Sequence, residues 1–232
     1  MLAWWTPARR RGVEFLDDPG VPDTIRDRSM ADVARANVLF GGSRAMLAGL
    51  HDALPTLPAR AVLLDVGTGT ADIAVRARDA ATRERVALTS VGLDLSASLL
   101  KRAGTRLDAA VVGDAMHLPI ADARVDVVAC SQLLHHFETD DARRVVAELH
   151  RVSRHWVVIS DLSRSWLAAA GFWVASVALR FHPVTRHDGV TSVLRGFTAA
   201  ELRQLVFEVT GVQPRVRRGA FWRLSATWAK SG

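Results

Sequence analysis

The chain is poor in cysteine, lysine and tyrosine. Its 232 residues include no tyrosine and one cysteine, Cys130. A single cysteine excludes an intramolecular disulfide framework and a zinc site built from several thiolates, so nothing here favours secretion. Lys101 and Lys230 are the only lysines among 30 cationic residues, which leaves 28 arginines. Such arginine-rich usage can follow from coding bias as well as from a binding partner.

Long apolar runs are also lacking. The stretch 166–179 has fourteen residues without a charge, whereas a helix needs about 20 apolar residues to cross a bilayer. It predicts either a cap helix packed on the rest of the domain, or an interfacial segment. In the second case Trp166, Phe172 and Trp173 line a lipophilic pocket or make a peripheral membrane contact. The N-terminal residues 1–12 place apolar residues before arginines, the wrong order for a signal peptide. We therefore expect a cytoplasmic protein.

Composition is otherwise that of an ordinary globular domain. Apolar residues make up 49% of the chain and charged residues 23%, far from the composition of disordered chains. The net charge is +6 and the isoelectric point is near 10.9. The cations are nevertheless scattered, apart from Arg9-Arg10-Arg11 and a group at 215–218. We therefore expect one domain with no nucleic-acid partner, and the oligomeric state stays open.

Short apolar runs alternate with helical stretches from residue 61 onward. The clearest helix spans 140–152, where five apolar side chains form one stripe. Runs that read as strands buried on both faces are 61–66, 88–94, 109–114, 125–130 and 155–160. A helix over 199–210 and strands over 212–218 and 220–229 follow. The alternation predicts an α/β fold with a mostly parallel sheet and helices on both faces.

Two segments lie outside this alternation. Residues 1–50 predict an N-terminal helical cap, in which Gly41-Gly42 separates two helices. Residues 163–197 form an irregular, partly apolar insertion after the fifth strand. We expect both to close a pocket over the carboxyl ends of the strands, where such sheets bind ligands. The main domain would then span 51–232.

The strongest motif is a glycine turn between a strand and a helix, LLDVGTGTADIAV. Its strand ends at Asp65, and glycines at 67 and 69 let the backbone approach a ligand closely. A nucleotide-like cofactor is therefore expected. The dinucleotide fingerprint needs a glycine or alanine where this chain has Asp72, which argues against NAD.

An acidic residue followed by alternating glycines resembles the first motif of class I S-adenosylmethionine (SAM)-dependent methyltransferases. The family's third glycine is Ala71 here. Three further motifs follow in order: VGLDLS with Asp94, GDAMHLPIAD with Asp114, and VDVVACSQLLHHF at the fourth strand. Residues 24–229 resemble the ubiquinone/menaquinone-type branch of small-molecule methyltransferases. The resemblance implies a Rossmann-like, seven-stranded, mostly parallel sheet and SAM as the cofactor.

The resemblance assigns cofactor roles residue by residue. Asp94 would accept both ribose hydroxyls, because a carboxylate suits that bidentate use. Asp114 would accept from the adenine amino group, while the N–H of Ala115 addresses a ring nitrogen. Asp65 would face the methionine ammonium and sulfonium. The full predicted cofactor set is Asp65, Gly67, Thr68, Gly69, Asp94, Leu95, Asp114, Ala115 and Ser131.

Methyl transfer from a sulfonium is an in-line displacement in which charge is lost, so alignment and desolvation supply much of the catalysis. A base is needed only for a nucleophile that arrives protonated. The predicted catalytic residues are His135, beyond strand four, and Arg186 with His187 in the insertion. Cys130 at the buried end of a strand is expected to be a packing residue. No acidic metal cluster is evident, and no metal is predicted.

The acceptor is the least defined part of the prediction. RDRSMADVARANVLFGG and RHDGVTSVLRGFTAAEL resemble a subgroup that acts on polyketide-derived aromatic substrates, as in secondary metabolism. We therefore expect C- or O-methylation of a small, apolar acceptor. One alternative is a protein that binds SAM without transferring its methyl group. Another is a nucleic-acid methyltransferase recruited through the arginines, against which the Ser-Gln-Leu-Leu element after strand four speaks.

Overall fold

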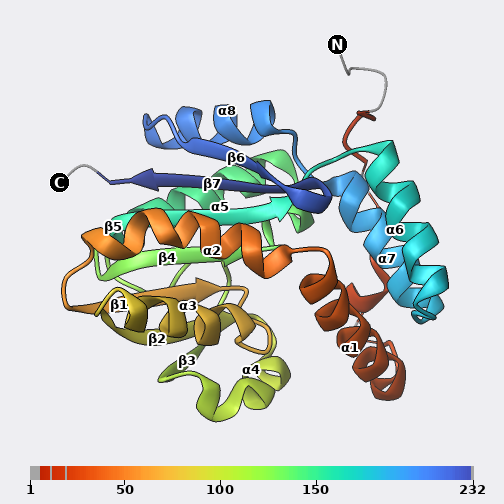
Figure 1. Ribbon diagram of the computed structural model, residues 1–232, viewed down its shortest axis with the longest axis horizontal. Helices are drawn as coiled ribbons and strands as arrows, with labels where there is room; N and C mark the ends of the chain where they lie inside the picture. The colour runs from red at the N-terminus through yellow and green to blue at the C-terminus, as the bar shows by residue number, and fades with distance from the viewer. Residues whose placement is uncertain (1–5, 11, 19, 231–232) are drawn as a thin grey trace.

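The computed structural model describes residues 6–10, 12–18 and 20–230 (Figure 1). Its centre is a seven-stranded sheet in the order β3-β2-β1-β4-β5-β7-β6. The strands are β1 (Arg60–Val66), β2 (Ala87–Asp94), β3 (Ala109–Val112), β4 (Val125–Ser131), β5 (Ser153–Leu162), β6 (Arg215–Gly219) and β7 (Arg223–Ala229). All pairs among β1 to β5 are parallel, and β7 runs antiparallel to both of its neighbours. The predicted mostly parallel sheet is confirmed.

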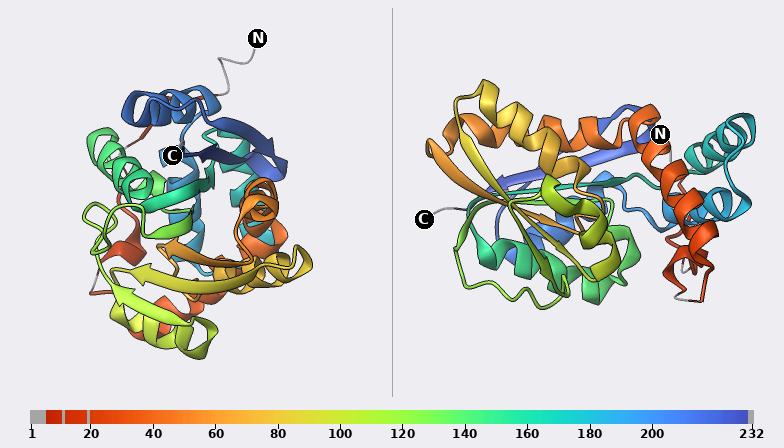
Figure 2. Two further views of the ribbon diagram at one scale, coloured as in Figure 1. Left: turned by 90° about the vertical axis from the view of Figure 1, so that its left-hand side faces the viewer. Right: turned by 90° about the horizontal axis from the view of Figure 1, so that it is seen from below.

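Helices cover both faces of the sheet. Residues of α2 and α3 join one apolar cluster with the sheet, and residues of α5 and α8 join another on the opposite face. Figure 2 shows the two helical layers on either side of the strands. The helices are α1 (Asp23–Leu39), α2 (Gly42–Ala53), α3 (Asp72–Arg83), α4 (Ala97–Ala103), α5 (Thr139–Val152), α6 (Trp166–Ala178), α7 (Pro183–Arg195) and α8 (Ala199–Thr210).

Local sequence explains the best-predicted elements. Val125–Cys130 of β4 are all buried, because helices cover this central strand on both faces. The predicted stripe of α5 is buried along its whole length. Helix α8 begins with a capping box in which Thr198 and Glu201 each accept a backbone N–H of the other.

The prediction of an irregular insertion over 163–197 was wrong, because this segment forms α6 and α7, whereas the helix offered as one reading of 166–179 is present as α6. Ser165 caps α6 by accepting the N–H of Leu167 at 3.2 Å, and Pro183 occupies the first turn of α7. Helix α6 is apolar on all sides, so its sequence lacks the alternation of polar and apolar faces that marks an amphipathic helix.

Helices α1, α6 and α7 gather beyond the carboxyl ends of the parallel strands (Figure 1). Helix α2 lies instead along the sheet, where a Cβ added to Gly49 would approach Val158 Cγ1 to 2.5 Å. The predicted boundary at residue 50 therefore falls within α2. Residues 1–5 of the predicted cap, and Arg11 of its basic run, lie outside the described residues. The described cap thus consists of the segment before α1, α1 itself, α6 and α7.

Candidate functional site

The loop between β1 and α3 turns through left-handed backbone conformations. Gly67, Gly69 and Ala71 have φ of +71°, +54° and +65°. A Cβ at Gly67 would lie 2.9 Å from the side chain of Leu133, whereas a Cβ at Gly69 would meet nothing within 4 Å. The loop is thus packed against the β4 exit at Gly67 and open at Gly69, where a ligand can approach the backbone.

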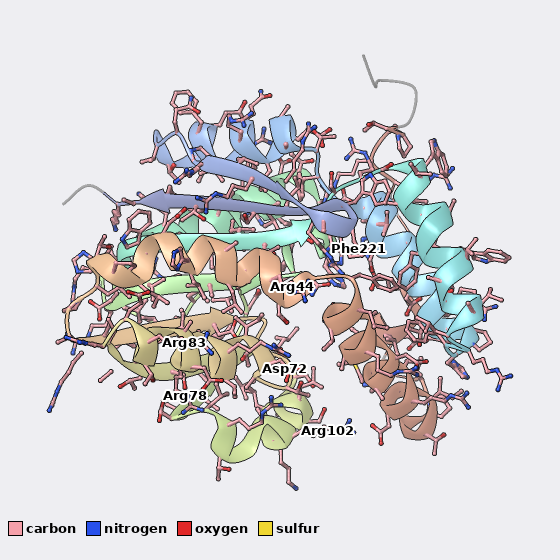
Figure 3. The ribbon with its side chains drawn as sticks, in the orientation of Figure 1. Arg44, Asp72, Arg78, Arg83, Arg102 and Phe221 are labelled. Atoms are coloured by element: carbon pink, nitrogen blue, oxygen red, sulfur yellow. The ribbon has the colours of Figure 1, made fainter. Side chains whose placement is uncertain are left out.

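Asp72 occupies the position at which a dinucleotide-binding loop has its third glycine, and here its side chain anchors the loop. Its carboxylate pairs with Arg106, which also donates to the carbonyl oxygen of Thr70 at 2.6 Å. Figure 3 shows Asp72 at the loop end of α3. The side chain therefore fixes the loop to the 3₁₀ turn Gly104–Arg106.

Asp65 lies at the end of β1 with its carboxylate buried. Its Oδ2 accepts the hydroxyl of Thr68 at 2.8 Å. Burial raises the pKa of Asp65 to about 7, although the hydrogen bond from Thr68 opposes this rise. A cation placed beside Asp65 would restore the ionised form, so the site suits a positively charged ligand group.

Asp94 is the last residue of β2, and Asp114 follows the last residue of β3 by two positions. Asp94 accepts the N–H of Gly69 through Oδ2 and that of Ser96 through Oδ1, both at 2.9 Å. Asp114 Oδ1 accepts the N–H of Met116 at 2.8 Å. Both carboxylates therefore hold turns of their own strand exits, and Asp94 also joins the β2 exit to the glycine loop. Next to them Leu95 is exposed and Ala115 is buried.

The β4 exit begins with Ser131 and Gln132. Ser131 Oγ is buried and has no hydrogen-bond partner among the described residues. Gln132 has φ of +53°, and its N–H donates to the carbonyl oxygen of Ser160 at 2.7 Å. Burial raises the pKa of the Cys130 thiol well above its usual range, so Cys130 is a packing residue rather than a nucleophile.

His135 lies in the 3₁₀ turn Leu134–His136 and is 3% exposed. Its Nδ1 lies 2.6 Å from Oδ1 of Asp161, and its backbone N–H donates to Oδ2 of the same carboxylate at 2.9 Å. Burial alone would raise the pKa of Asp161, but the charge and hydrogen bonds of His135 outweigh it and lower that pKa. Asp161 therefore stays ionised and fixes the imidazole.

The second nitrogen of His135 faces a polar group formed with the N-terminal segment. His135 Nε2 lies 3.9 Å from Glu14 Oε1, which also accepts from Ser192 at 2.7 Å and from Arg195 at 3.3 Å. The ring of His136 packs at 4.3 Å from that of His135. A cavity of about 390 Å³ borders this group, lined by Arg9, Arg10, Gly12, Val13, His135, His136, Phe137, Glu138, Thr139 and Arg195.

Arg186 and His187 lie on α7 beside a different cavity. It measures about 490 Å³ and is lined by Arg10, Gly12, Trp173, Pro183, Arg186, His187, Val190, Thr191 and Leu194. His187 Nδ1 lies 3.0 Å from the buried carboxylate of Asp188, which also accepts the N–H groups of Phe15 and Leu16. The two cavities share Arg10 and Gly12, so the predicted catalytic residues occupy neighbouring cavities rather than one. Neither lining includes the three strand-end aspartates.

Aromatic side chains gather where α1 meets α2 and where β6 meets β7. The ring of Phe40 lies 5.9 Å from that of Phe172 and 5.8 Å from that of Phe221. Phe221 and Trp222 both have positive φ, at +54° and +53°, and both are exposed. Figure 3 shows Phe221 at the tip of this turn, near the start of α2. The turn is strained, as is common at ligand sites.

Helix α6 exposes much of its apolar surface. Trp173 is 52% exposed, and exposed apolar side chains also occur at Trp166, Leu167, Val174 and Val177. Among the described helices, none combines the length and apolar character that a bilayer crossing requires.

Three residues at the site were missed by the sequence analysis: Glu14, Asp161 and Arg223. Asp161 ends a buried strand, the same signal that identified Asp65 and Asp94. Glu14 and Arg223 carry no local signal, because their partners lie far away along the chain. Arg223 donates to Oε1 of Gln132, 91 residues earlier, and Glu14 accepts from a serine 178 residues later.

Comparisons with known proteins agree with this geometry. Residues 64–158 match the family model of a methyltransferase domain. No curated relative matches the chain in sequence. The plantazolicin methyltransferase in complex with SAH (S-adenosylhomocysteine) aligns with a TM-score of 0.68 and 12% identity, over 94% of this chain and 93% of its own. A SAM-dependent methyltransferase from Thermotoga maritima aligns with a TM-score of 0.61 and 15% identity, over 90% of this chain and 99% of its own.

The magnesium protoporphyrin IX methyltransferase of Synechocystis PCC 6803, with bound SAM, aligns with a TM-score of 0.53 and 13% identity, over 94% of this chain and 89% of its own. The matched segment is thus a methyltransferase domain, and the chain shares its fold with these SAM-dependent methyltransferases. The cofactor of such a domain is SAM.

Proposed function

We propose that this SAM-dependent methyltransferase methylates carbon or oxygen of a small, largely apolar acceptor of aromatic or polyketide-like structure. The observation that carries the proposal is the group of phenylalanine rings, Phe40, Phe172 and Phe221, in which Phe40 is joined through Arg223 to Gln132 at the β4 exit. Stacked and edge-on contacts with such rings suit a flat apolar molecule. The sequence resemblance to the ubiquinone/menaquinone-type branch supports the same acceptor class.

The residues of the β1 to β4 exits fit SAM. The open side of Gly69, the buried carboxylate of Asp65 and the unpartnered hydroxyl of Ser131 offer space, a negative charge and a polar contact. Asp94 would hold the ribose and Asp114 the adenine. When bound, SAM supplies a methyl group activated by its sulfonium.

His135 is the candidate base for an acceptor hydroxyl. Asp161 holds the Nδ1 side of the ring, so Nε2 is the nitrogen that can take a proton. This nitrogen faces Glu14 rather than open solvent. The pair resembles the arrangement in which a buried carboxylate orients an imidazole base.

Arg186 and His187 would contact the acceptor from α7. If they do, Arg186→Ala and His187→Ala should lower turnover while SAM affinity stays within about threefold. The measurement pairs a SAH-release assay on phenolic and naphtholic acceptors with calorimetry of SAM binding. Full turnover in both variants would show that these two residues of α7 do not contact the acceptor. SAM binding without product formation on any acceptor would favour a protein that binds SAM without transfer.

Exposed α6 supports a peripheral membrane contact as a second part of the proposal. Trp166 and Trp173 are amphipathic rings of the kind that lie at a membrane interface. An apolar acceptor dissolved in a membrane could then enter at the cap.

A further inference from the structure

Arg223 is a buried arginine at the acceptor side of the sheet. It is the first residue of β7 and is 5% exposed. Its Nε–H donates to the carbonyl oxygen of Phe40 at 3.1 Å, and Nη1 donates to Gln132 Oε1 at 2.7 Å. The guanidinium thus touches both the junction of α1 with α2 and the exit of β4. These two contacts use two of its five N–H donors.

The charge of Arg223 is not neutralised by an ion pair. Among the residues that the structure describes, no carboxylate lies within 4.0 Å of its nitrogens. Asp161 attracts the guanidinium from a distance but is already paired with His135. Burial lowers the pKa of Arg223 to about 10. A buried cation without a partner is costly to retain, so a buried arginine is ordinarily found beside an anion.

Two buried hydroxyls share the face of the sheet on which Arg223 lies. In the sheet register Leu162 is opposite Arg223, and Ser160, two residues earlier on β5, is opposite Ser131 of β4. Side chains two residues apart on a strand, and those directly opposite, project from the same face. The hydroxyls of Ser131 and Ser160 have no hydrogen-bond partner among the described residues. Ser160 is 1% exposed.

We propose that Arg223, with Ser160, binds a planar anionic group of the acceptor that presents two oxygens, either a carboxylate or the enolate of a β-dicarbonyl. A guanidinium fork matches such a group with two parallel hydrogen bonds. The inference rests on the proposed function and deepens it, since it makes the acceptor an acidic aromatic or polyketide-like molecule.

The position of Arg223 favours the acceptor over the cofactor as the source of the anion. The glycine loop and Asp94 lie at β1 and β2, whereas Arg223 lies on β7, beyond β4 and β5 in the sheet. Phe221 lies in the turn directly before β7 and its ring contacts that of Phe40, whose carbonyl oxygen Arg223 binds; this turn is strained. Movement of that turn would admit the acceptor to the guanidinium.

The test measures binding of 1-hydroxy-2-naphthoate and its neutral amide, 1-hydroxy-2-naphthamide, to the protein saturated with SAH. The naphthoate should bind the wild-type protein at least about tenfold more tightly than the amide. Arg223→Gln should remove this preference while SAH affinity stays within about threefold. Arg218→Gln, at an exposed arginine of neighbouring β6, is the matched control and should change nothing.

Three results would overturn the inference. They are equal binding of naphthoate and amide by the wild-type protein, an unchanged preference in Arg223→Gln, and a loss of SAH affinity above about tenfold in that variant. The last would assign the guanidinium to the carboxylate of SAM. If Arg223→Gln fails to fold, Ser160→Ala decides, with an expected loss of about tenfold for the naphthoate alone. Failure of the wild-type protein to bind SAH would count against the proposed function instead.

Discussion

The strand-end region has two halves: a cofactor half at the exits of β1, β2 and β3, and an acceptor half formed by the exits of β4 and β5, the cap and the start of β7. The two halves are held together in different ways. In the cofactor half, the polar contacts are mostly local: Asp65 bonds a residue three positions later, and Asp94 and Asp114 each bond a residue two positions later. In the acceptor half, Glu14 accepts from Ser192, 178 residues later, and Arg223 donates to Gln132, 91 residues earlier. Local contacts preserve a motif that can be read from sequence, whereas distant contacts leave none.

The acceptor half should therefore also be the half in which single substitutions cost most stability. His135→Ala would leave the carboxylate of Asp161 buried without its partner, and we expect a loss of about 3–5 kcal/mol in the free energy of unfolding. Urea denaturation at neutral pH measures it. His51→Ala, at an exposed histidine of α2, is the control. A further change of Asp161 to Asn in the His135→Ala background should recover part of the loss, and a loss below about 1 kcal/mol would show that the pair is not coupled.

In the cofactor half, the largest effect should fall on binding. Asp94→Ala removes the contact with the N–H of Gly69, together with the predicted acceptor of the two ribose hydroxyls. We expect SAM and SAH affinity to fall about 30- to 150-fold, equivalent to roughly 2–3 kcal/mol. Calorimetry with SAH measures it, and Asp79→Ala on exposed α3 surface is the control. Unchanged affinity would mean that Asp94 only holds its turns.

This contrast also explains what could be predicted from the sequence. The sheet, α5 and α8 follow from buried runs, an apolar stripe and a cap, all of which are local patterns. The positions of Asp65, Asp94 and Asp114 at three neighbouring strand ends follow from the same alternation. Their roles toward SAM remain predictions.

The acceptor half could not be predicted in the same way. Helix α6 is apolar on every side, so the sequence offered a helix over 166–179 but could not indicate which of its faces is buried. Arg223 reads in the sequence as one arginine among many, and its burial becomes evident only when β7 is inserted between β5 and β6. His135 was identified as a candidate, but its separation from Arg186 and His187 into neighbouring cavities depends on the path of the segment before α1.

A pH profile tests the charge expected in the cofactor half. The pKa of Asp65 is about 7 in the folded protein and near 3.8 when unperturbed. Because the pKa is raised by folding, this group favours the fold below about pH 4, and the benefit is lost as the pH rises through 7. The cation of SAM needs the ionised form, so SAM affinity should fall by up to about tenfold per pH unit below 7.

The corresponding variant separates Asp65 from other titrating groups. Asp65→Asn should bind SAM more weakly at pH 8 and should flatten the affinity profile between pH 6 and 8. Calorimetry in two buffers of different ionisation enthalpy should also detect proton release on SAM binding by the wild-type protein near pH 7. A wild-type profile that is flat over this range would show that Asp65 is already ionised without SAM.

The smallest expected effect lies on the outer surface of the acceptor half, at Trp173. This side chain is 52% exposed yet lines the same cavity as Arg186 and His187. Trp173→Asp should leave the melting temperature within about 2 °C, because little buried area is lost. It should raise the acceptor KM severalfold or abolish sedimentation with anionic liposomes, since an aspartate disfavours both an apolar acceptor and a lipid surface.

Phe207→Asp is the matched control for Trp173→Asp, because Phe207 is 45% exposed on α8, a helix that covers the sheet rather than the cap. It should alter neither KM nor liposome binding. If Trp173→Asp instead lowers the melting temperature by about 5 °C or more, the side chain belongs to the packed cap. The surface of α6 would then stabilise the fold of the acceptor half rather than bind an acceptor or a membrane. The two halves would in that case differ only in how far apart in sequence their contacting residues lie.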